Sequence, residues 1–187
     1  GDNALGANTT ASNNTAVGSS AMTANTTGYS SVAVGYLALT TQTTGYQNTA
    51  IGREALEALT TGVSNTAVGK SAGTAITTAA SNTAIGTGAL ETTSTGALNT
   101  AVGAQSLQMN TTGDNNVAVG YQALEENTTA DNNTALGHQA MTANTTGTSN
   151  VAVGQASLSA NTTANDNTAV GYNSLGAANT GAGSTAV

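Results

Sequence analysis

Residues 120–136 read GYQALEENTTADNNTAL, and variants of this stretch fill the chain. A glycine stands at Gly1, Gly18 and every seventeenth residue after that up to Gly171, with no insertion or deletion between them. Aligned on this glycine, the repeat reads Gly-x-x-Ala-Leu-x-Ala-Asn-Thr-Thr-Gly-x-x-Asn-Thr-Ala-Val. We number its positions 1 to 17 from the glycine, and we call the residues that share one position a column.

The 187 residues divide into eleven repeats of seventeen, which predicts a single domain, 1–187, made of one repeat array. Solenoids normally carry polar caps at their ends, and this array has none, so we expect it to be a window of a longer fibre. The repeats are 1–17, 18–34, 35–51, 52–68, 69–85, 86–102, 103–119, 120–136, 137–153, 154–170 and 171–187.

The composition is poor in both apolar and charged residues. Leu, Ile and Val make up 27 of the 187 residues, and only 6% are charged. The net charge of −7, with Arg53 and Lys70 as the only basic side chains, argues against a nucleic-acid partner. The absence of cysteine excludes disulfides and thiolate metal sites, and no apolar run is long enough to be embedded in a membrane.

The repeat predicts short strands rather than helices. Each unit carries glycine and several threonines, which destabilise helices, whereas Asn-Thr-Ala-Val alternates as a strand does. The glycine that follows supplies one corner, and the Gly or Ala at position 11 supplies another. Strand, corner, strand and corner together predict an all-β parallel β-solenoid, or β-roll, whose eleven coils stack at roughly 4.8 Å.

Variation within each column predicts which way its side chains point. Columns with few residue types should face inward or form corners, and this group comprises positions 1, 4, 5, 10, 14, 16 and 17; position 10 is Thr in every repeat, from Thr10 to Thr180. The variable columns 2, 3, 6, 7, 12 and 13 hold every charged residue and every tyrosine, and should face water. Val17 and its equivalents are expected to fill a roomy inner seam. Position 14, which is Asn in nine repeats, indicates either a hydrogen-bonded amide ladder or a simple turn preference.

The motifs resemble those of known surface fibres. The run NTAVG at residues 65–69, and NTAVGAQSL at 99–107, are similar to the head repeats of YadA-like trimeric autotransporter adhesins. GYQAL at 120–124 and NTTG at 144–147 resemble the repeats of phage tail fibres and related bacterial surface fibres even more closely. The resemblance covers the whole chain and implies left-handed β-rolls, three chains wound about one axis, and a role as fibre shaft or adhesin head.

Low apolar content independently suggests partners, because a thin coil buries little and a second copy would supply further buried surface. We therefore expect a homo-oligomer, favouring a trimer, and an extracellular, cell-surface or virion location. A cell-surface glycan or protein is the expected receptor. Two alternatives are an ice-binding solenoid with threonine ladders and a filament formed by end-to-end self-assembly.

Catalysis and cofactors are not expected. A nucleophilic triad would need the single histidine, His138, which stands in variable column 2 with nothing to orient it. Asp114 and Asp131 share position 12 on successive repeats and are a weak candidate calcium site. The candidate receptor-contact residues are the tyrosines, which otherwise only shield the backbone; they are Tyr29 and Tyr46 at position 12, and Tyr36, Tyr121 and Tyr172 at position 2.

Overall fold

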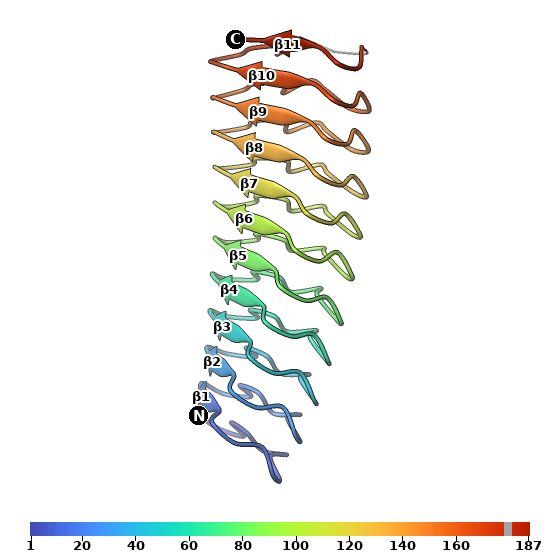
Figure 1. Ribbon diagram of the computed structural model, residues 1–187. Helices are drawn as coiled ribbons and strands as arrows, with labels where there is room; N and C mark the ends of the chain where they lie inside the picture. The colour runs from blue at the N-terminus through green and yellow to red at the C-terminus, as the bar shows by residue number, and fades with distance from the viewer. Residues whose placement is uncertain (178–180) are drawn as a thin grey trace.

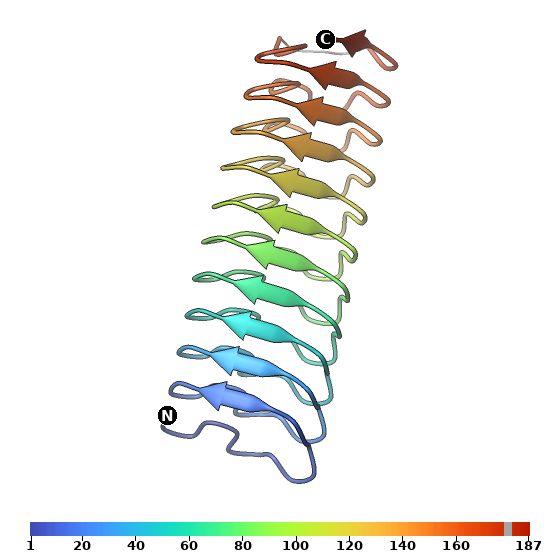
Figure 2. The ribbon, with the colours of Figure 1, turned by 60° about the vertical axis from the view of Figure 1, so that its left-hand side comes forward.

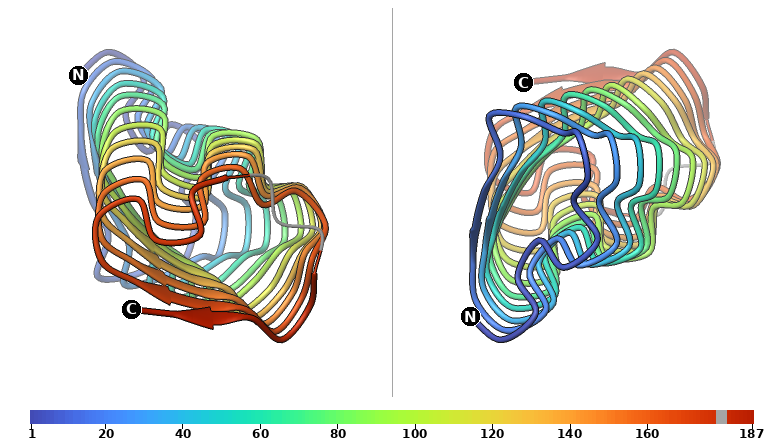
Figure 3. Two further views of the ribbon diagram at one scale, coloured as in Figure 1. Left: turned by 90° about the horizontal axis from the view of Figure 1, so that it is seen from above. Right: turned by 90° about the horizontal axis from the view of Figure 1, so that it is seen from below.

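A computed structural model describes residues 1–177 and 181–187, so Thr180 lies outside the described residues. Each repeat forms one coil, and we number the coils 1 to 11 after their repeats. The coils stack into an elongated solenoid with the two termini at opposite ends (Figure 1). Seen along the axis, successive coils nearly superimpose and are turned slightly in one sense (Figure 3). The chain is therefore an all-β parallel β-solenoid, as predicted, and its described residues contain no helix.

Each coil contributes one short strand, at positions 15 to 17, to a single parallel sheet along one side of the solenoid (Figure 2). Every strand pairs with the strands before and after it in sequence order, and partners such as Ala33 and Ala50 are one repeat apart. The strands are β1 (Thr15–Val17), β2 (Val32–Val34), β3 (Thr49–Ile51), β4 (Thr66–Val68), β5 (Thr83–Ile85), β6 (Thr100–Val102), β7 (Val117–Val119), β8 (Thr134–Leu136), β9 (Val151–Val153), β10 (Thr168–Val170) and β11 (Thr185–Ala186), the last with two residues.

The prediction of a second strand in each coil was wrong for the described residues. Positions 3, 5 and 13 adopt positive φ in coil after coil, as at Gln122 (54°), Leu124 (52°) and Asn132 (61°), so the chain turns there instead of extending. The corner predicted at position 1 is confirmed, because its glycines from Gly18 to Gly171 have φ between 121° and 140°. A Cβ at Gly120 would lie 2.4 Å from the carbonyl oxygen of Gly137, so only glycine fits there.

The interior is narrow and filled by small or medium side chains. Positions 4, 5 and 16 are buried in the inner coils, as predicted; in coil 8 they are Ala123, Leu124 and Ala135. Position 14 is buried too, and its amides form the predicted ladder in a modified form. Asn48 Oδ1 accepts the backbone N–H of Asn65 at 2.9 Å, while Asn48 Nδ2 donates to the Gly62 carbonyl at 2.8 Å. The amide thus satisfies two backbone groups of the next coil, and Asn65 does the same one coil further on.

Column 10 was expected to face inward or to form a corner, and it forms a corner: its described threonines, from Thr10 to Thr163, lie exposed in the bend at positions 9 and 10. No contact accounts for their invariance. The inward prediction for column 17 was wrong: Ile51 and Ile85 are each 40% exposed, and Val34 is half-buried. Neighbouring strand residues point to opposite faces, so a buried Ala at position 16 sends positions 15 and 17 outward together.

Position 8 is buried in coils 2 to 10 although its residue type varies widely. Where it is Asn, the amide donates both to a backbone carbonyl and to the amide of the preceding coil: Asn127 Nδ2 reaches the Ala130 carbonyl at 3.1 Å and Asn110 Oδ1 at 2.9 Å. Leu59 and Ile76 occupy the same column as apolar residues. The column accepts either chemistry because Asn and Leu have similar length and each finds suitable partners.

No helix within residues 1–177 or 181–187 has the length and apolar character needed to cross a membrane.

Candidate functional site

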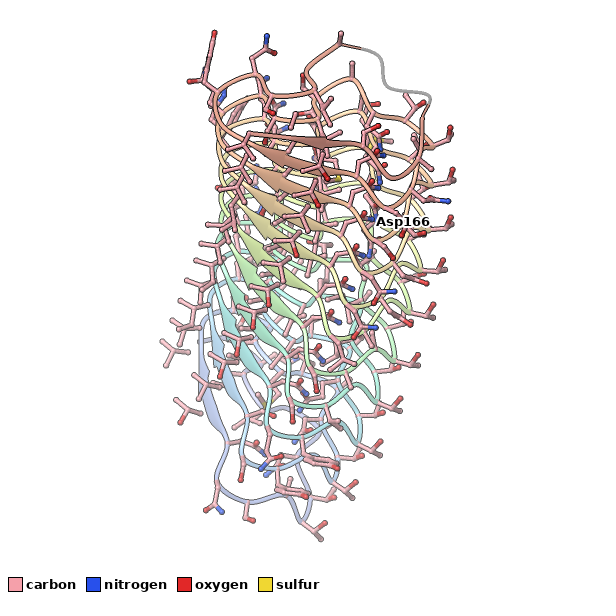
Figure 4. All side chains as sticks on the ribbon, turned by 45° about the horizontal axis from the view of Figure 1, so that its top comes forward. Asp166 is labelled. Carbon is pink, nitrogen blue, oxygen red and sulfur yellow. The ribbon has the colours of Figure 1, made fainter. Side chains whose placement is uncertain are left out.

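Three sets of outward-facing columns lie on the sheet or next to it, where a partner can reach them. Columns 15 and 17 form the outer face of the sheet, which we call the strand face. Columns 2 and 3 follow the strand along the chain, and columns 12 and 13 precede it. Figure 4 shows side chains projecting from the solenoid along its length. They include Asp166 of column 13, which is exposed in the turn before β10. Of the predicted water-facing columns, only Gly88 is buried.

The five candidate tyrosines do not converge on one site. Tyr29 and Tyr46 of column 12 stack with ring centroids 4.8 Å apart and planes 3° from parallel. Tyr36, Tyr121 and Tyr172 stand in column 2, at the other end of the strand, and all three are exposed. Tyr121 stacks on His138 with centroids 5.4 Å apart. The structure therefore forms two short aromatic stacks, one at each side of the strand face, and their role in receptor contact stays a prediction.

The carboxylates of Asp114 and Asp131 cap backbone amides. Asp131 Oδ1 accepts the N–H of Asp114 at 2.7 Å, and Asp114 Oδ1 accepts the N–H of Ala97 at the same distance. Asn165 does the same for Thr148 in column 12. Calcium takes six to eight oxygen ligands, and the described residues form no group of three or more acidic, His or Cys side chains placed to hold a metal. The geometry thus explains Asp at position 12 structurally and adds no support for calcium.

The neighbouring threonine columns 9 and 10 differ in the hydrogen bonds that their hydroxyls make. At position 9 the hydroxyls from Thr9 to Thr145 donate to the position 9 carbonyl of the next coil, as from Thr26 to Thr43 at 3.1 Å and from Thr60 to Thr77 at 3.2 Å. The Thr43 carbonyl also receives the N–H groups of Thr26, Thr27 and Gly28, which closes the turn at positions 9 to 11. Column 10 is left as the exposed threonine rank.

His138 packs against Tyr121, and no hydrogen bond joins its side chain to a serine, threonine or acid among the described residues. The arrangement offers no oriented base for a nucleophile. Absence of catalysis stays a prediction.

Column analysis did not predict the hollow in the surface that follows β4, β5 and β6. It has a volume of about 210 Å³. Gly88 is the only glycine in column 3, and it breaks a column that elsewhere carries side chains; that break is the signal from which the hollow was foreseeable. The lining includes Lys70, Thr87, Gly88, Glu91, Gln105 and Gln108.

Fold and surface together place the chain in the class of repeat proteins built as parallel β-solenoids, with coils of seventeen residues. Comparison with protein-family models, curated proteins and solved structures found no match to this chain.

Proposed function

We propose that this chain is a non-catalytic structural segment, a shaft or adhesin head, of a fibre on a cell or virion surface, and that it winds with two further copies into a homotrimer. The observation that carries the proposal is the strand face. Its column 17 is Val, Ile or Leu in every repeat. Ile51, Ile85 and Leu136 are 38–40% exposed in the single chain although their strands lie in the interior of the sheet.

An apolar column running the length of the sheet favours a partner of the same repeat. Eleven strands at roughly 4.8 Å make a face about 50 Å long, and a second copy of the chain offers apolar groups at the same spacing along its whole length. Burying apolar area contributes about 25 cal/mol per Å², and closed rotational symmetry satisfies several such faces at once. The resemblance to trimeric adhesin heads and tail-fibre repeats supports three chains and an extracellular or virion location.

The face is tested by placing charge on it. Ile85→Lys combined with Leu136→Lys puts two ammonium groups on the outer side of β5 and β8. In a single unassembled chain these groups lie in water. We expect the wild type to sediment as a trimer and this variant as a monomer with an unchanged far-UV circular dichroism spectrum.

The matched control is Ser19→Lys with Gln155→Lys, since column 2 is exposed at both sites and already carries Lys70. The control should remain trimeric. A monomeric wild type contradicts the trimer, and a trimeric Ile85→Lys, Leu136→Lys variant contradicts assembly through the strand face. Electron microscopy of the native assembly should show rods three chains thick. Filaments one chain thick would instead indicate end-to-end assembly of single chains.

Ice binding is a second candidate, and the exposed threonine rank of column 10 is the observation that favours it. Its ten described members, from Thr10 to Thr163, follow one another at one per coil, and none of them donates a hydrogen bond from its hydroxyl. The hydroxyls of column 9 are already committed to carbonyl groups, so only one regular hydroxyl rank is free on this side. Freezing-point depression by the purified chain would favour this second function over the shaft.

A further inference from the structure

The hollow beside Gly88 interrupts the regular surface where column 2 becomes small. Along this column Lys70 of coil 5 is followed by Thr87, Ala104 and then Tyr121 of coil 8. Three coil spacings separate the two large side chains, roughly 14 Å. Between them the hollow has a volume of about 210 Å³ and is lined by groups of coils 5, 6 and 7. The turns that carry these groups follow β4, β5 and β6, the strands labelled in Figure 1.

Its polar wall is organised by hydrogen bonds. Gln139 donates to Gln122 at 3.0 Å and Gln122 to Gln105 at 3.5 Å, so a glutamine ladder of column 3 runs down to the edge of the hollow and ends at Gly88. Gln105 Nε2 then donates to Gln108 Oε1 at 3.3 Å, and Gln108 Nε2 donates to Glu91 Oε2. This chain of bonds holds two amides and a carboxylate in fixed orientations.

Two charged groups at the hollow are still available to a ligand. Glu91 Oε1 and the Lys70 ammonium make no hydrogen bond or ion pair with any of the described residues. The wall therefore offers a carboxylate oxygen as acceptor and an ammonium as donor, beside amides that can do both. Neither charge dominates, so the wall suits a neutral ligand with many hydroxyl groups better than an ion.

Tyr121 adds an aromatic surface on one side. Its ring is 44% exposed and stacks on His138 of the next coil. In the preceding coil, column 2 carries Ala104, which lines the hollow and has only a methyl side chain. An aromatic face at the edge of a polar hollow suits a ring that has hydroxyls around its rim and C–H groups on its flat face. A sugar ring in its pyranose form has this combination.

We propose that the hollow, together with the open face of Tyr121, binds one pyranose ring at the terminus of a glycan chain. Glu91 Oε1 accepts hydroxyl protons, Lys70 donates to hydroxyl oxygens, and Tyr121 packs against the C–H face. The volume lies below the roughly 300 Å³ at which ordinary ligand pockets begin, so a single ring is held and the rest of the chain lies outside. The biological setting rests on the proposed surface fibre, whereas the binding itself does not.

Filling the hollow is the sharpest test. Gly88→Gln introduces the residue that column 3 carries in coils 7 to 9, where Gln105, Gln122 and Gln139 have φ of 54–58°, close to the 66° of Gly88. A Cβ there would lie 3.2 Å from Glu91 Oε2, the end of a long side chain that needs to shift by only a few tenths of an ångström, so the coil should still fold. The control Ala156→Gln makes a column 3 substitution in coil 10, away from the hollow.

Saturation-transfer NMR with the methyl pyranosides of glucose, galactose and mannose gives the readout, with arrays of immobilised glycans ending in the same sugars as a second arm. We expect at least one glycoside and its glycan to bind the wild type and Ala156→Gln. Affinity should fall at least tenfold in Gly88→Gln, and also in Glu91→Gln, which keeps the shape of the wall and removes its charge.

No binding of any of these sugars to the wild type overturns the proposal, as does binding that Gly88→Gln leaves unchanged. Binding of a free glycoside but of no immobilised glycan overturns the assignment to a glycan chain. Sedimentation of the same samples separates this outcome from failure of the fibre proposal, because the hollow and the strand face lie on different columns.

Discussion

At position 5, burial of the side chain stabilises the fold, whereas the backbone conformation of the same residue destabilises it. The Leu and Met residues of this column have φ between 48° and 55°, a conformation that costs an L-residue about 1–2 kcal/mol. Complete burial of a leucine or methionine contributes about 1.5–3 kcal/mol, and Leu39, Leu124 and Met141 are all fully buried. Burial therefore holds these residues in a backbone region that their own preferences disfavour.

Thr93 is a second residue in conflict with its surroundings. It lies fully buried in column 8, and its hydroxyl oxygen has no hydrogen-bond partner. Thr93→Val keeps the shape and removes the stranded polar group, so we expect the free energy of unfolding to rise by about 1 kcal/mol. Chemical denaturation monitored by circular dichroism measures it. Exposed Thr95→Val should change stability by less than about 0.5 kcal/mol, and a Thr93→Val variant less stable than wild type would contradict the prediction.

Within a single coil, unusual residues compensate for one another. Coil 5 has Gly73 at position 5, where the other coils have Leu or Met, and Ile76 at position 8. A Cβ on Gly73 would lie 3.0 Å from Cδ1 of Ile76 and 2.9 Å from Cδ2 of Leu56. The isoleucine and the leucine of the preceding coil thus occupy the space that a side chain at position 5 normally fills.

This compensation predicts coupling between two substitutions. Gly73→Leu alone overpacks the coil and should lower the free energy of unfolding by about 1–3 kcal/mol. Adding Ile76→Asn restores the Leu and Asn pair of coils 7 and 8, so the double variant should be at least about 1 kcal/mol more stable than the sum of the single effects predicts. A double-mutant cycle by denaturation measures the coupling. Gly73→Leu with Asn127→Leu, three coils away, should be additive; additive effects at Gly73 and Ile76 would refute the compensation.

For the whole molecule, stability comes from contacts between nearest neighbours. Each strand pairs only with the strand of the coil before and the coil after, and the amides of columns 8 and 14 bond along the same axis. Deleting one entire coil therefore costs the stability of that coil and of one interface between coils. Every column stays in register.

Deletion of residues 137–153, which is coil 9, joins Leu136 to Gly154 with all columns continuous. We expect cooperative melting at a temperature only a few degrees lower, followed by circular dichroism. Deletion of 137–152 shifts every later column by one position, which sends buried side chains outward and outer ones inward. That variant should lose the structure beyond β8, and equal stability of the two deletions would contradict register control.

Much of the fold was predictable from the repeat, and the errors have a common cause. Ala135 at position 16 and Leu124 at position 5 were correctly placed inside because a constant small or apolar residue signals close packing. Val119 was wrongly placed inside, although alternation from a buried Ala118 already required it to face outward. Of the candidate site, the columns of the tyrosines were predictable, and Gly88 was an available signal for the hollow. The ring stacks and the lining of the hollow were not predictable, because they depend on side-chain positions in three dimensions.

The period of seventeen, the parallel stacking of like residues and the inward columns 4, 5, 14 and 16 all follow from the amino-acid sequence. The exposure of Thr44 in constant column 10 and the burial of Asn127 in variable column 8 became known only from the folded coil. The physical reason is that recurrence along a stack reports how a residue meets its own copies above and below. Which way it points depends on the turns within the coil, and these are set by positive φ at positions 3, 5 and 13, where the side chains themselves favour another backbone shape.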